Sequence, residues 1–232
     1  MKAFAKLILA SVLLGTALPA CAQEIVVTGS RREADDYDAS MPIITLRRTA
    51  DFAIREVTIS GDTRDADKRH DEIYAMIRGA IELAPKYGVE LATGEYIVEP
   101  LTLANYRNLP LVDDRRPDTN KTSFSVKVRL EPGMDAKAAL ARIERFIKAV
   151  PAVGRAQMEP SGDLTLSVVN PDQYRGTIID LIAADAAATA AKFGPDYGVE
   201  VKGLDRPVEW ARASLTEVFL FLPAAYVVRP KE

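Results

Sequence analysis

The stretch Thr122-Ser-Phe-Ser-Val-Lys-Val-Arg-Leu130 alternates polar and apolar side chains along its whole length. One side of an extended backbone carries the apolar set, which is Phe124, Val126, Val128 and Leu130. The other side carries the polar set, which is Ser123, Ser125, Lys127 and Arg129. This alternation predicts a strand with one buried face and one solvated face. Such strands are typical of antiparallel sheets, because parallel sheets are covered on both faces.

Similar segments flank this strand on both sides. Upstream lie a strand, a helix and the segment Tyr87-Gly-Val-Glu90, and downstream lie a strand, a helix and the segment Tyr197-Gly-Val-Glu200. We therefore expect an α+β fold in which antiparallel or mixed sheets pack with three main helices. The domain should span 43–230 as two related β-α-β halves, about 43–121 and 122–230.

Periodicity and turn residues place the elements of this domain. The predicted extended segments are 43–61 (as one strand or two in line), 89–103, 122–130, 163–169, 199–201 and 215–222. The predicted helices are 68–87, 134–150 and 170 to about 192, and a long polar loop is expected at 104–121. In the third helix Asn170 is the expected N-cap and Gln173 would complete a capping box. Its many alanines suit close packing on a sheet or on another helix.

Length and charge limit the class of protein. The 232 residues suffice for one large or two small domains. The formal charge is −3, and loss of Lys2 and Lys6 with a signal peptide leaves −5. A net acidic chain lacks the basic surface of a nucleic-acid binder, so no nucleic-acid partner is expected.

The first 22 residues have the features of a secretory signal. Lys2 and Lys6 precede the apolar run 7–18, which is too short to span a bilayer and is followed by small residues. Cleavage after Ala20-Cys-Ala22 would give a periplasmic chain that starts at Gln23 and lacks cysteine, hence without an intrachain disulfide. Leu18-Pro-Ala-Cys21 resembles a lipoprotein box, so an anchor on Cys21 is the alternative. No later stretch is apolar enough to span a membrane.

The segment after the signal resembles a different family. Glu24-Ile-Val-Val-Thr-Gly-Ser-Arg-Arg32 is similar to the segment that opens the plug of many TonB-dependent outer-membrane receptors. The resemblance covers nine residues, and the chain has no room for the many strands of such a receptor. We interpret 23–42 as a flexible linker that begins with a short extended segment and continues into acidic residues.

Few residues are candidates for chemistry. His70 is the only histidine and lies among charged residues at a helix start, so a solvated position is expected and no typical metal site can be built from it. Asp113 and Asp114 lie beside arginines and lack the spacing of a calcium loop. The sequence has no Gly-x-Ser-x-Gly, His-Glu-x-x-His or Cys-His pair. We therefore expect no enzyme activity and no catalytic, cofactor-binding or metal-binding residues.

The segment 215–222 is apolar on both faces, with Val218, Leu220 and Leu222 on one and Phe219 and Phe221 on the other. Such a strand needs a central place in a sheet, helices on each face or a neighbouring subunit. We expect a neighbouring subunit to cover part of it, and hence a homo-oligomer.

Taken together, the elements from about 44 to 228 resemble the SIMPL domain family of secreted bacterial envelope proteins. The resemblance rests on the order of elements and on the block Leu166-Ser-Val-Val-Asn-Pro-Asp-Gln-Tyr-Arg175, followed by an alanine-rich helix with Asp180 and Asp185. It implies an α+β fold, an envelope location, assembly into rings or larger oligomers, and no established enzymatic activity. The receptor-like start and the region of Trp210 depart from the family pattern.

Two functions follow from these observations. The first is a non-enzymatic secreted envelope protein of SIMPL type that self-assembles. The alternative is a periplasmic module that binds a small molecule or an outer-membrane or other envelope protein, with Trp210, Phe219 and Tyr226 lining the site. Core packing is the simpler explanation for these three aromatic residues.

Overall fold

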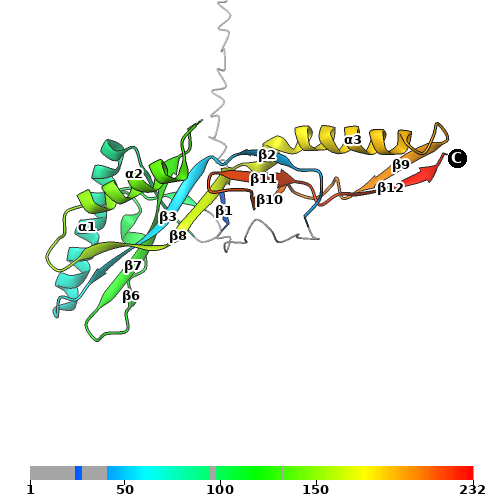
Figure 1. Ribbon diagram of the computed structural model, residues 1–232. Helices are drawn as coiled ribbons and strands as arrows, with labels where there is room; N and C mark the ends of the chain where they lie inside the picture. Colours follow the sequence, from blue (N-terminus) through cyan, green and yellow to red (C-terminus); the bar gives the residue numbers. More distant parts are fainter. Residues whose placement is uncertain (1–23, 28–40, 95–97, 132, 232) are drawn as a thin grey trace, which may run out of the picture.

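The structure, a computed structural model, describes residues 24–27, 41–94, 98–131 and 133–231. A broad part with two helices lies at one end, and a narrow arm built on a third helix projects at the other (Figure 1). The predicted signal peptide and Cys21 lie outside the described residues, as does most of the predicted linker. Residues 24–27 of that linker form a strand.

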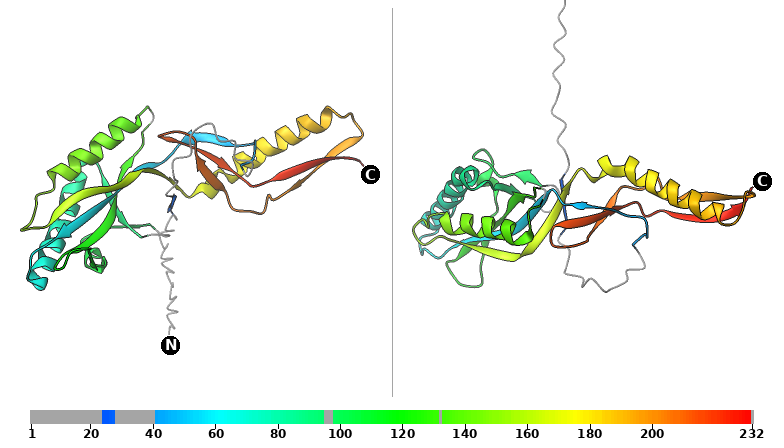
Figure 2. Two further views of the ribbon diagram at one scale, coloured as in Figure 1. Left: turned by 60° about the horizontal axis from the view of Figure 1, so that its bottom comes forward. Right: turned by 45° about the horizontal axis from the view of Figure 1, so that its top comes forward.

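The largest sheet lies in the broad part, and all its described pairs are antiparallel. Its order is β1 (Glu24–Val27), β8 (Gln157–Val169), β3 (Phe52–Gly61), β7 (Asn120–Arg129), β4 (Glu90–Thr93) and β5 (Glu99–Pro100), with β6 (Val112–Asp113) also on β7. Helices α1 (Ala66–Tyr87) and α2 (Ala136–Ala149) lie on one face of it (Figure 2). The predicted α+β class is confirmed.

Two β-α-β units build this sheet. They are β3-α1-β4 and β7-α2-β8, and their four strands lie in the order β8-β3-β7-β4. This is the split β-α-β arrangement, in which the first strands of the two units are neighbours at the centre. The predicted second half, 122–230, divides in the structure: residues up to 169 complete this sheet, and those from 170 build other parts of the molecule.

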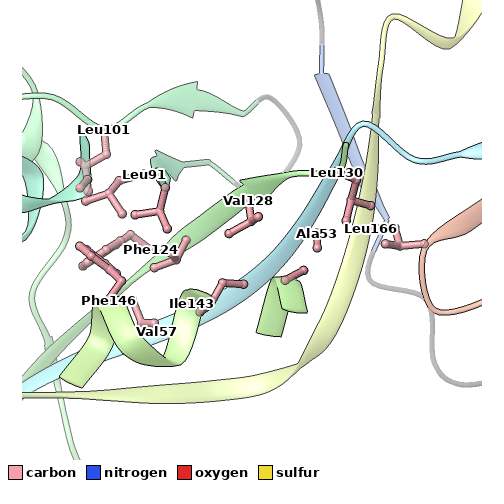
Figure 3. Packing of buried hydrophobic residues seen from close by; sticks show 14 of the residues in the cluster. Ala53, Val57, Leu91, Leu101, Phe124, Val128, Leu130, Ile143, Phe146 and Leu166 are labelled. Carbon is pink, nitrogen blue, oxygen red and sulfur yellow. The ribbon is translucent and has the colours of Figure 1, made fainter. Parts of the chain in front are cut away.

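The core lies between the sheet and the two helices. The predicted inward residues of β7 and its end, Phe124, Val126, Val128 and Leu130, are all buried. Figure 3 shows Phe124 and Leu91 of the sheet beside Phe146 of α2. The predicted solvated face needs a correction at Lys127, which is only 5% exposed because its side chain lies over Phe52.

Local signals fix the ends of both helices. Asp65 accepts a hydrogen bond from the Lys68 amide and caps α1, and Asp135 does the same for the Ala138 amide of α2. Gly88 ends α1 with φ of 62°, a conformation that favours glycine.

Several predicted boundaries differ in the structure. The extended segment 89–103 is two short paired strands, β4 and β5. The predicted loop 104–121 contains the 3-10 turn η1 (Tyr106–Asn108) and the strand β6, and β7 already begins at Asn120. β8 is longer than the predicted 163–169, and a register shift opposite Arg55 divides its pairing with β3.

Two smaller sheets use the rest of the chain. The first has the order β10 (Glu209–Arg212), β11 (Glu217–Phe221) and β2 (Leu46–Thr49), so the predicted segment 43–61 contributes strands to two different sheets. The second pairs β12 (Ala225–Pro230) with β9 (Tyr197–Lys202). The two strands are not consecutive in the chain, and their antiparallel pair is called the hairpin below. Helix α3 (Arg175–Ala191) lies along this pair of strands and completes the arm (Figure 1).

The start of α3 corrects the predicted capping box. A 3-10 turn, η2 (Pro171–Tyr174), precedes the helix, and the Asn170 side chain makes no capping hydrogen bond. Gln173 instead donates to the carbonyl of Val169 at 2.7 Å. Asp172 accepts from the Val208 amide at 2.9 Å, so the side chains near the helix start serve other connections.

Candidate functional site

The doubly apolar strand β11 finds its cover within the chain. It is the central strand of its sheet, between β10 and β2, and Val218, Leu220 and Phe221 are buried. Of the three protections considered from the sequence, a central place in a sheet is the one observed. A second subunit is therefore not needed to pair the edges of this strand, and Phe219 on its other face is half-buried.

The three aromatic residues considered as a binding site do not converge. Trp210 lies opposite Leu220 in the β10–β11 pair, whereas Phe219 is the next residue along β11 and points to the other face of the sheet. Tyr226 lies in β12, in the separate sheet of the arm. The structure therefore assigns these side chains to three different surroundings.

The candidate polar residues also serve local contacts. His70 is half-buried on the first turns of α1. Asp113 accepts a hydrogen bond from Asn120 at 2.8 Å, and Asp114 forms an ion pair with Lys121 at 2.9 Å. Within the described ranges, no group of three or more His, Cys, Asp or Glu side chains is placed to hold a metal ion. No helix in those ranges is both long and apolar enough to cross a bilayer.

A buried polar cluster closes one end of the main sheet. Arg69 donates from Nε to Asn120 at 2.5 Å. The Glu72 carboxylate accepts from the Thr63 hydroxyl at 2.6 Å and from the Arg155 amide at 3.1 Å. These hydrogen bonds lower the pKa of Glu72, the Thr63 bond most. The cluster joins the β3–α1 turn to the α2–β8 connection, which is a structural role.

The broad part has an apolar cavity of about 320 Å³ between the end of α1 and strands β4 and β5. Its walls include Ile81, Leu91, Leu101 and Lys127. A cavity of this size is at the lower end of the range for small-molecule sites.

The arm is thin because the buried side chains of its helix become smaller toward the tip. The buried residues of α3 change from Ile178 and Ile182 near the start to Ala186 and Ala190 near the tip. Small residues let the helix approach the two-stranded hairpin closely. A two-stranded hairpin is marginal by itself in water, so this packing is needed to hold β9 and β12 together.

Two contacts join the hairpin to its helix and close its base. The Tyr226 hydroxyl donates to Asp185 at 2.5 Å and lies 3.2 Å from the Thr189 hydroxyl, which ties β12 to α3. At the base, a Cβ on Gly203 would lie 2.6 Å from the carbonyl oxygen of Pro223, and Gly203 has φ of 86°. Only glycine allows this close approach of the two backbone segments.

The arm joins the rest of the molecule through charged side chains. Arg175 at the start of α3 donates to the carbonyl oxygens of Arg206, at 2.5 Å, and Leu204. Arg48 of β2 lies over the Tyr174 ring, with 4.4 Å between Cζ and the centroid, and pairs with Asp51 at 2.8 Å. These contacts therefore hold the first turns of α3, and the tip of the arm lies at the far end of the molecule (Figure 1).

A groove of about 540 Å³ runs along the arm between α3 and β9. Its helix side consists of small residues, which are Ala183, Ala186, Ala187, Ala190, Ala191 and Gly194. Its strand side consists mainly of Tyr197, Val199 and Val201. Among the described residues β9 pairs only with β12, so the other edge of β9 is open beside this groove.

The hairpin face away from α3 is polar. Glu200 pairs with Lys202 and with Arg229, each at 3.1 Å. The hydrogen bond from Lys202 and the charge of Arg229 lower the pKa of Glu200. Apolar side chains are exposed around them: Val227 lies on this face at 52% exposure, and the ring-contacting pair Phe193 (58%) and Tyr197 (38%) lies at the tip.

Comparisons with known proteins add little to this geometry. No family model matches the chain, and no curated protein matches it. A search of solved structures found a chain titled "Crystal structure of a hydrolase from Listeria innocua", at 11% identity and a TM-score of 0.16 over 78% of this chain and 91% of that one. A TM-score this low supports no inference about fold or activity.

Sequence reasoning missed the arm as a unit. β12 was not predicted, although Tyr226 and Val228 alternate with the more exposed Ala225, Val227 and Arg229. The groove depends on how α3 packs against β9, which periodicity does not reveal.

Proposed function

We propose that the protein is a non-enzymatic, secreted envelope protein of SIMPL type that self-assembles through its arm. The observation that carries this proposal is the projecting two-stranded arm, whose strand β9 leaves one edge unpaired within the described chain. Unpaired edges present backbone donors and acceptors in a row, and they are ready sites for pairing with another chain. The sheet of the broad part and β11 provide the stable body that presents the arm.

Exposed apolar side chains on the arm support the same proposal. Phe193, Tyr197 and Val227 are all far more exposed than core residues. Aromatic residues are enriched in the buried centres of protein interfaces, and a thin arm gains stability when a partner covers it.

Sedimentation velocity of the chain that begins at Gln23, measured over a series of concentrations, tests assembly. The proposal predicts a species of at least twice the chain mass at micromolar concentration. A single-chain species throughout the series contradicts it. A core variant such as Val128→Asp cannot serve as a control, because Val128 is buried and the variant would not fold. The concentration series is therefore the control.

The export part of the proposal rests on Lys2, Lys6 and the Ala20-Cys-Ala22 site. Mass spectrometry of the cell-envelope fraction should find a chain that starts at Gln23. A diacylglycerol mass on Cys21 would support the anchored alternative, and a cytoplasmic chain that retains Met1 would contradict export.

A periplasmic binding module is the second candidate, and the apolar cavity between α1 and β4 favours it. Native mass spectrometry of protein purified from the envelope tests this candidate by the mass of a co-purified small molecule. Leu101→Trp should fill the cavity and abolish that added mass. An added mass unchanged by Leu101→Trp would place binding elsewhere and contradict the assignment of this cavity.

A further inference from the structure

The open edge of β9 has features that suit one occupant, a second copy of the same edge. Val199, Glu200, Val201 and Lys202 alternate apolar and charged residues, with the valines on the face toward α3. In an antiparallel pair, residues directly opposite each other share a face. An edge strand that pairs with its own copy therefore brings residues of the valine face opposite one another and residues of the charged face opposite one another.

We propose, building on the assembly proposed above, that two chains pair through β9 about a two-fold axis at Val201. In this register Val201 lies opposite the second copy's Val201, and Glu200 of each chain lies opposite Lys202 of the other. Both cross-strand pairs then join opposite charges, which stabilises a pair relative to alanine by about 0.2–1 kcal/mol. A register shifted to put Glu200 opposite Glu200 would join like charges and is disfavoured.

The spacing of the arm fits this pairing. Each hairpin is two strands wide, and strands in a sheet lie about 4.8 Å apart, so the centres of two joined hairpins are about 10 Å apart. Packed helices have axes 8–10 Å apart. The two α3 helices would therefore meet across the former groove, where Ala183, Ala187 and Ala191 are exposed and small enough to allow the contact.

Within the described ranges β12 pairs only with β9, and its other edge is less suitable for pairing with a second copy. β12 contains Pro230, which lacks a backbone N–H, and proline is a common means of preventing pairing at a sheet edge. β9 has no proline. Antiparallel pairing through β9 also brings the exposed tip, with Phe193 and Tyr197, toward the 203–207 turn of the second copy, so that the pairing covers these rings.

Charge exchange tests this pairing on the chain that begins at Gln23. Glu200→Lys puts lysine opposite lysine, and Lys202→Glu puts glutamate opposite glutamate, so each variant alone should raise the dimer dissociation constant roughly tenfold or more. An equimolar mixture of the two variants restores opposite charges in the mixed dimer, and light scattering should recover the wild-type mass. The recovery also shows that each variant is folded.

A second pair of variants tests the helix contact. Ala187→Glu places a charged side chain in the groove and should prevent dimer formation, whereas Ala188→Glu, at an exposed neighbour that does not line the groove, should not. If the wild type is a single chain at micromolar concentration, both this inference and the proposed assembly fail. If the wild type assembles but neither the single charge variants nor Ala187→Glu change its mass, only the β9 pairing fails.

Discussion

Lys127 and Phe52 lie on neighbouring strands of the main sheet, with 4.1 Å between the Lys127 Nζ and the centroid of the Phe52 ring. Arg129 approaches the same ring, with 4.5 Å between its Cζ and the centroid. Both cations lie on the face of the sheet away from α1 and α2. That face of β7 is therefore built around an aromatic ring at this position, and its lysine is part of the packed structure.

We predict that Lys127→Asp destabilises the protein by about 2 kcal/mol or more. The substitution removes a cation–π contact worth roughly 0.5–2 kcal/mol and places a carboxylate in a buried position. Ser123→Asp is the control, because Ser123 lies on the same face of β7 but is exposed. Chemical denaturation measures both variants, and equal unfolding free energies would contradict the assignment of Lys127 to the packed face.

The sequence predicted the inward face of β7 correctly because alternation determines which side chains share a face. It did not predict the burial of Lys127, because alternation carries no information about Phe52 on the adjacent strand. β6 and β10 were missed because each is too short to show a clear alternation, and each is defined by its pairing with the next strand along the chain. The ends of α1 and α2 were predicted to within two residues, since their apolar stripes and caps are local signals, whereas α3 begins at Arg175, after the predicted start at 170.

The candidate interface was even less accessible to sequence reasoning. Alanines in α3 indicated close packing, but nothing in the sequence distinguished the alanines on the hairpin from those beside the open edge. Trp210, Phe219 and Tyr226 were considered together because they are aromatic and near in sequence, and strand geometry separates them.

Gly154→Ala should destabilise the protein more than Gly162→Ala. Both glycines have positive φ, 57° and 71°, so alanine is strained at either position. A Cβ at Gly154 would lie 2.2 Å from the Glu72 carboxylate, whereas a Cβ at Gly162 meets nothing within 4 Å. We expect an additional loss of about 1–3 kcal/mol at Gly154, because Glu72 must leave its hydrogen bonds. Thermal unfolding compares the stability of the two variants. Equal losses of stability would contradict the packing of Glu72 on Gly154.

The Glu72 carboxylate should make stability depend on pH in the acid range. Its pKa is lowered in the folded state, chiefly by the Thr63 hydroxyl and then by the Arg155 amide. The contribution of the ionised Glu72 carboxylate to the free energy of unfolding is therefore complete above the unfolded pKa of about 4.3. This contribution is lost as the pH falls through the folded pKa. Denaturation at pH 7 should find Glu72→Gln less stable than the wild type, and the difference should shrink below pH 4. A difference that stays constant down to pH 2 would contradict this role.

Tyr226→Phe should loosen the arm and leave the main sheet unchanged. The substitution removes the 2.5 Å hydrogen bond to Asp185, and hydrogen bonds to charged groups contribute about 1.5–3 kcal/mol. Amide hydrogen exchange should become faster in β9 and β12 but not in β3 or β7. Tyr197→Phe is the control within the arm, because no hydrogen bond from the Tyr197 hydroxyl is seen among the described residues. Equal exchange in the two variants would mean that Asp185 does not hold the hairpin.

The distance between spin labels attached at Val227→Cys in the chain that begins at Gln23 tests the pairing of two arms most directly. That chain has no other cysteine, and Val227 is exposed on the face away from α3. Val227 lies opposite Glu200, so two labelled positions in the joined sheet are separated by three inter-strand gaps of about 4.8 Å each. The pairing predicts a narrow distance distribution between backbone positions of about 15–20 Å, lengthened by the label arms. A long or absent distance at concentrations where the protein is assembled would contradict it.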